Sequence, residues 1–78
     1  MEGKPMLALA SYADYEDADS ERVDAMKAVI AANGGTVAGE AGGEDAGEYR
    51  IAFRCSTPGE FSRIEALGAD EGWEVARR

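Results

Sequence analysis

Apolar and polar positions change their spacing several times along this chain, and each change predicts a different element. An apolar run over residues 6–12 follows Pro5 without a polar interruption before Ser11, which is typical of a central strand. Residues 48–55 instead alternate strictly, with large apolar side chains at every second position. This period of two indicates a strand with one buried face. Together, the two runs predict the inner strands of a sheet.

Two weaker strands complete the pattern. Residues 36–41 contain a single large apolar residue, Val37, and follow a pair of glycines. Near the end of the chain, Trp73 and Val75 lie two positions apart and therefore share one side of a final strand. Both segments also carry charged residues, which suits strands at the edges of a sheet.

The first helix is predicted between the first two strands. Val23, Met26 and Ile30 recur at helical spacing and form its apolar stripe. We expect it to end at Asn33-Gly34-Gly35, because glycine readily adopts the left-handed conformation found after helices. Three residues suit its N-cap, namely Asp17, Asp19 and Ser20.

The second helix has the clearest local pattern in the chain. Thr57-Pro58-Gly59-Glu60 is a capping box with proline at the first helical position. Phe61, Ile64 and Leu67 follow on one helical face, and Gly68 is expected to end the helix.

Residues 1–78 are therefore expected to form a single α+β domain with the ferredoxin-like order β-α-β-β-α-β. This arrangement has a four-stranded antiparallel sheet with two helices on one face, and its first and third strands are central. We expect the open face of the sheet, which suits a homodimer if the protein is not a monomer, to carry Met6, Ala8, Ala10, Tyr12, Arg50, Ala52 and Arg54.

Charge narrows the range of partners. The 78 residues contain 16 Asp and Glu against 8 Lys and Arg, and the formal net charge is −8. Such a charge repels nucleic acids and anionic membranes and attracts basic partners. It also increases solubility, and net charge alone does not distinguish the two roles.

The chain offers little for catalysis. It contains no histidine, which is the commonest general base and metal ligand. Its single cysteine, Cys55, lies on the predicted buried side of a strand, so a structural thiol is expected. A calcium-binding EF-hand loop starting at Asp14 would need glycine where Asp19 stands and glutamate where Ala25 stands. We therefore expect no enzyme, no cofactor and no dedicated metal site.

Acidic residues gather in two groups, for which we predict a role in partner binding. The first group surrounds the start of the first helix and consists of Asp14, Glu16, Asp17, Asp19, Glu21 and Asp24, with Tyr15 as an aromatic anchor. The second group lies around the predicted hairpin and consists of Glu44, Asp45 and Glu48. We expect the two groups at opposite ends of the sheet. A line of carboxylates imitates part of the charge density of duplex DNA, but acids at the start of a helix also simply stabilise it.

Two features of the sequence indicate the cellular compartment. The apolar run over residues 6–13 is short for the hydrophobic part of a signal peptide and leads directly into acidic residues. A single cysteine allows no intramolecular disulfide, which fits a reducing compartment. A cytoplasmic protein without a membrane span is the expectation.

Two families resemble the chain. In its small size, its charge and its acidic run over residues 14–24, it resembles the small acidic anti-CRISPR proteins of phages. That resemblance implies a protein that blocks target-DNA binding by a Cas surveillance complex. Residues 64–75, with a helix, a glycine turn and a Gly-Trp pair, are similar to the end of the ribonuclease-regulator B family. The longer acidic extensions of that family, whose members bind and inhibit a ribonuclease, are missing here.

These observations lead to one expected function and two alternatives. The expected function is an acidic, inhibitory protein-binding module that occupies a basic, nucleic-acid-binding surface, most concretely as an anti-CRISPR acting on a Cas subunit. The alternatives are a ribonuclease-regulator-like inhibitor and a small-ligand-sensing regulatory domain that acts as a dimer.

Overall fold

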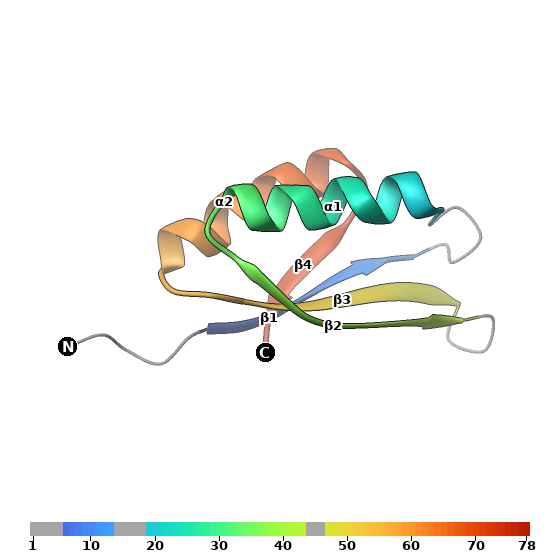
Figure 1. The fold of residues 1–78 in the computed structure, drawn as a ribbon, viewed down its shortest axis with the longest axis horizontal. Coiled ribbons are helices and arrows are strands. Elements are labelled where there is room, and N and C mark those ends of the chain that lie inside the picture. Colours follow the sequence, from blue (N-terminus) through green and yellow to red (C-terminus); the bar gives the residue numbers. More distant parts are fainter. Residues whose placement is uncertain (1–5, 14–18, 44–46) are drawn as a thin grey trace.

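A computed structural model describes residues 6–13, 19–43 and 47–78, and these residues form two layers. The elements are, in order, β1 (Met6–Tyr12), α1 (Ser20–Ala32), β2 (Thr36–Gly43), β3 (Glu48–Cys55), α2 (Pro58–Asp70) and β4 (Glu74–Arg77). All strand pairs are antiparallel, and the sheet order is β2-β3-β1-β4. Both helices lie on the same side of the sheet (Figure 1). The predicted ferredoxin-like α+β fold is confirmed, with the first and third strands at the centre.

The helix starts agree with the sequence pattern and resolve its open choice. Asp19 is the N-cap of α1, and its Oδ1 accepts a hydrogen bond of 2.9 Å from the backbone N–H of Arg22. At α2, the hydroxyl of Thr57 accepts from the backbone N–H of Glu60 at 3.2 Å. The Glu60 carboxylate then accepts from the N–H of Ser56 at 2.7 Å, one residue earlier than in a standard capping box.

The expected end of α2 at Gly68 is wrong, because the helix continues to Asp70. The turn is made instead by Gly72, whose φ of +89° is in the left-handed region. The N–H of Trp73 donates to the carbonyl of Gly68 at 2.8 Å, which completes a Schellman motif. α1 ends in the same way around Gly34, as expected.

Gly68 has a packing role inside the helix. A Cβ at this position would lie 3.0 Å from Met26 Cε on α1 and 3.0 Å from Val75 Cγ2 on β4. α2 therefore approaches both neighbouring elements so closely that a methyl group at this point would require Met26 or Val75 to shift.

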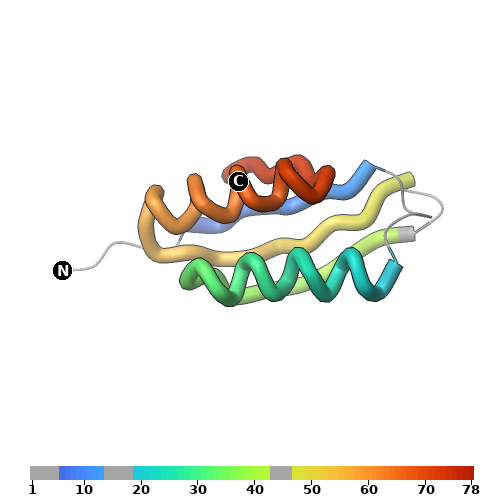
Figure 2. Tube along the Cα trace, turned by 90° about the horizontal axis from the view of Figure 1, so that it is seen from above, coloured from blue at the N-terminus to red at the C-terminus, as the bar shows by residue number. Residues whose placement is uncertain are grey.

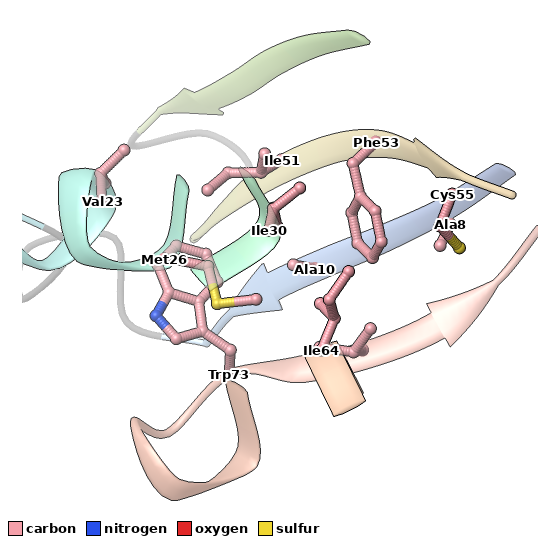
Figure 3. Packing of buried hydrophobic residues seen from close by; sticks show 11 residues of the cluster. Ala8, Ala10, Val23, Met26, Ile30, Ile51, Phe53, Cys55, Ile64 and Trp73 are labelled. Atoms are coloured by element: carbon pink, nitrogen blue, oxygen red, sulfur yellow. The ribbon is translucent and has the colours of Figure 1, made fainter. Parts of the chain in front are cut away.

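The core is one cluster of buried residues between the helices and the sheet (Figure 3). Its largest fully buried side chains come from both layers and are Phe53, Met26, Ile30, Ile51 and Ile64. Trp73 and Val75 join the cluster from one side, as their spacing predicted.

The expected orientation of β1 is wrong. Ala8 and Ala10 are 1% and 0% exposed and belong to the core, whereas Leu7 is 49% exposed. Met6 and Tyr12 also pack against the core instead of lying on the open face. The predicted positions of Arg50, Ala52 and Arg54 opposite the core are consistent with the alternation of buried and exposed residues along β3.

Pairing across the sheet explains this orientation. Ala8 lies opposite Phe53, and Ala10 lies opposite both Ile51 and Val75. Directly opposed residues in an antiparallel pair point to the same face, and a shift of one residue would exchange the two faces. The large side chains of β3 and β4 thus place the alanines of β1 inside.

We predict that Gly68→Ala destabilises the fold by about 1 kcal/mol, because overpacking outweighs the gain in helix propensity. Val75 is branched at Cβ and Met26 is fully buried, so neither side chain withdraws easily. Gly59→Ala in the first turn of α2 is the control, since its new methyl group would meet no atom closer than 3.9 Å. We expect this control to stabilise by about 0.5 kcal/mol. Urea denaturation measures both changes, and an equally stable Gly68→Ala variant would contradict the packing argument.

Candidate functional site: the acidic end of the sheet

The register of β1 brings several chain connections to one end of the sheet. Tyr12, at the end of β1, lies opposite Tyr49, which is close to the start of β3. On the other side of β1, Ser11 lies opposite Glu74, the first residue of β4. The residues that flank the β1–α1 connection and those that flank the β2–β3 hairpin are therefore neighbours. The expectation that these regions lie at opposite ends of the sheet is wrong.

The path of α1 is the reason. This helix returns the chain along the sheet, so that β2 runs in the same direction as β1 and both end at the same side. Figure 2 shows α1 starting, and β1 and β2 finishing, at this end. The described residues that flank the two acidic groups are therefore neighbours in the fold, although the groups are some twenty residues apart in sequence.

Six described carboxylates surround this end, and we call them the acidic end. They are Asp19, Glu21, Glu48, Asp70, Glu71 and Glu74. Asp70 and Glu71 belong to it because α2 finishes here, a contribution that the sequence analysis missed. The remaining predicted contact residues, Asp14, Tyr15, Glu16, Asp17, Glu44 and Asp45, lie outside the described residues.

The described carboxylates differ in how they are engaged. Asp19 caps α1, and Glu48 forms an ion pair with Arg50 on the same strand. Glu21 and Asp24 are exposed on the first turns of α1 and have no polar partner within the described residues. Glu21 is thus the more accessible part of the acidic end, and Asp24 extends it along the helix.

An aromatic cluster of Tyr12, Tyr49 and Trp73 packs next to the acidic end. The rings of Tyr12 and Trp73 are 5.3 Å apart between centroids, and those of Tyr49 and Trp73 are 6.5 Å apart in an edge-to-face arrangement. The buried indole N–H of Trp73 has no acceptor in the described part of the chain. Aromatic residues near the ends of adjacent strands were the sequence signal for this cluster.

Arg22 joins the two helices across this cluster. Its guanidinium lies 4.8 Å from the centroid of the Tyr12 ring, a cation–π contact. It also donates a hydrogen bond of 3.4 Å to the backbone carbonyl of Glu71. Arg22, which is the only cation in the acidic run over residues 14–24, therefore contacts Tyr12 and Glu71 within the fold.

The opposite end of the molecule carries cations. Arg54 lies opposite Leu7 near the start of β1, and Arg77 lies opposite Ala8. Arg78 follows β4, where its backbone N–H donates to the carbonyl of Leu7 at 2.9 Å. Three arginines are therefore grouped at the end of the sheet opposite to the acidic end.

Glu40 is an acidic residue with a structural role. Its carboxylate forms an ion pair with Lys27 Nζ on α1 at 2.6 Å, and it accepts a hydrogen bond of 2.6 Å from the Tyr49 hydroxyl. The hydrogen bond from Lys27, followed by that from Tyr49, holds the pKa of the Glu40 carboxyl below its usual value. This residue ties α1 to β2 and β3.

Reactive chemistry has little support among the described residues. Burial, and then the nearby Glu60 carboxylate, raise the pKa of the Cys55 thiol and so lower its nucleophilicity at neutral pH. Within residues 6–13, 19–43 and 47–78, no three Cys, Asp or Glu side chains are grouped closely enough to hold a metal ion.

No family model, curated protein or solved structure matches this chain. Among the described residues, neither helix has the length and apolar character that crossing a bilayer requires.

We predict that Glu40→Gln lowers stability by about 0.5 kcal/mol at neutral pH, the range of a partly exposed ion pair. The contribution of a carboxyl with a lowered pKa is present above its unfolded pKa and is lost as pH falls through the folded pKa. The difference between wild type and variant should therefore shrink on acidification. Urea denaturation at neutral and acidic pH measures it, with the exposed Glu65→Gln as control. A difference that does not depend on pH would contradict this assignment.

Proposed function

We propose that this protein is an acidic binding module whose acidic end occupies a basic, nucleic-acid-binding surface of another protein. The observation that carries the proposal is the convergence of carboxylates from both helices, β3 and β4 at one end of the sheet. The two described cations nearby, Arg22 and Arg50, are already engaged within the chain. Four carboxylates of the acidic end are exposed and form no ion pair within the described residues, namely Glu21, Asp70, Glu71 and Glu74.

The strands set the spacing of these charges. Glu48 on β3 and Glu74 on β4 flank β1, so their strands are two positions apart, or about 10 Å. The helix ends add Glu21 and Glu71 in the second layer. A two-layer array of carboxylates on a rigid support offers charges in place of phosphates to a basic groove, and opposite charges accelerate the encounter.

In its concrete form, we propose an anti-CRISPR that blocks target-DNA binding by a Cas surveillance complex. The small size, the net charge of −8 and the acidic run at the start of α1 support this form. Inhibition of a ribonuclease, the alternative suggested by residues 64–75, would use the same electrostatics on a different basic target.

The test is a charge reversal that leaves the fold intact. Asp19 is unsuitable because it caps α1, and its replacement would cost about 1 kcal/mol. Glu21 and Glu71 are exposed, so Glu21→Lys combined with Glu71→Lys changes the acidic end alone. Purified Cas surveillance complexes and a ribonuclease are incubated with each variant, and DNA binding or RNA cleavage is measured at several salt concentrations. We expect wild type to inhibit, less strongly as salt rises, and the double variant to lose at least about tenfold in potency.

The matched control places the same change in net charge elsewhere. Three exposed positions on α2 lie away from the acidic end, namely Ser62, Glu65 and Ala66. Changing all three to Lys alters the net charge of the chain by the same amount as the double variant. This control should inhibit nearly as well as wild type. Equal loss in both variants would indicate that net charge alone matters, and the absence of inhibition by wild type would contradict the proposed function.

A further inference from the structure

No described element covers the sheet face opposite the helices, and this face carries an apolar strip. Leu7 and Leu9 of β1 point to this side, and Leu7 is one of only two large hydrophobic residues that are exposed among the described residues. A shallow hollow of about 260 Å³ lies beside them, lined by Leu9, Ala52 and Gly39 together with Glu40, Ala41, Arg50 and Arg78. A chain with so few large apolar residues has placed two of them outside its core, which indicates an interaction surface.

The charges on this face have a fixed order along the strands. At one end, Arg54 lies opposite Leu7 and Arg78 is bonded to it through the backbone, so two guanidinium groups flank this leucine. At the other end, Glu48 and Glu74 share a small hollow of about 120 Å³ with Ser11. Along β1, the face therefore runs from two arginines beside Leu7, past Leu9, to Glu48 and Glu74, with Arg50 paired to Glu48.

Three of these four end charges have no partner within the described residues, whereas Glu48 is paired with Arg50 on the same face. The side chains of Arg54, Arg78 and Glu74 form no ion pair or hydrogen bond within the described residues. Glu74 and Arg78 are four residues apart, or about 13 Å along the strand direction, and do not pair with each other within one copy. Their opposite charges are therefore available for pairing between two molecules.

We propose that the open face binds a second copy of this chain, with the two sheets face to face and their central strands antiparallel. A twofold axis perpendicular to the strands places Arg78 of each copy near Glu74 of the other. The same operation brings Arg54 of each copy toward Glu48 of the other, stacks the two Leu9 side chains at the centre and places Leu7 of each copy over Ser11 of the other. The surface is thus complementary to itself, as an isologous interface requires.

Electrostatics selects this orientation over the other face-to-face arrangement. A twofold axis parallel to the strands would bring Arg54 of one copy toward Arg78 of the other and would put both acidic ends on the same side. The antiparallel arrangement separates the acidic ends to opposite extremities of the dimer. The dimer therefore presents the helix part of two acidic ends, with Glu21 and Glu71 outside the interface.

The test exchanges the charges on β4. Sedimentation velocity over micromolar to millimolar concentrations measures the dissociation constant of the dimer for wild type, Glu74→Arg, Arg78→Glu and the double exchange. Each single variant removes two intermolecular pairs and adds repulsion, so we expect the dimer to weaken about tenfold. The double exchange restores opposite charges in every pair and should return the dissociation constant to near that of wild type.

Net charge and folding are controlled separately. Glu74→Arg brings the net charge of the chain closer to zero, so a nonspecific effect would strengthen association instead of weakening it. Arg63→Glu and Glu65→Arg make the same charge changes on α2, away from the open face, and should leave the dimer unchanged. Circular dichroism reports whether each variant folds. A wild-type protein that stays monomeric, or a double exchange that does not recover, would overturn the proposal.

Discussion

Close approach of the helices to the sheet is the constraint on which the rest of this structure depends. The central strand β1 offers only Ala8 and Ala10 to the middle of the core, and α2 offers Gly68 at its nearest point to α1 and β4. Small side chains at these positions let a few large ones, such as Phe53 and Met26, fill the interior completely. A short chain with a limited supply of large apolar residues thereby closes a core between two layers.

This constraint also determines the outer surface. Because the alanines of β1 face inward, the alternation of a strand sends Leu7 and Leu9 outward. The apolar strip on the open face is therefore a direct consequence of how the core is packed. The same alternation places the arginines of β3 on that face, next to the leucines. Core packing and the proposed dimer surface are thus two results of one choice of strand orientation.

Charge separation follows from the topology in a similar way. α1 returns the chain so that β1 and β2 finish at one end, and α2 finishes there as well. Acidic residues near these chain ends become neighbours, and the aromatic cluster with Arg22 fixes the two helices in this position. Arg54 of β3 and Arg77 of β4 lie at the far end. The two proposed interactions share Glu48 and Glu74, and the helix carboxylates of Glu21 and Glu71 remain for a basic partner in the dimer.

Local sequence determined the elements, because their signals act over a few neighbouring residues. The caps at Asp19 and Thr57 and the alternation of β3 are of this kind, and they were sufficient for the order of elements and the fold. The concentration of acids around the start of α1 was equally visible in the sequence. Only the tertiary structure decided which face of β1 is buried, because its partners Phe53, Ile51 and Val75 lie far away in sequence. It also decided that the acidic residues of α1, α2, β3 and β4 meet at one end of the sheet, since that depends on the direction in which each helix returns the chain.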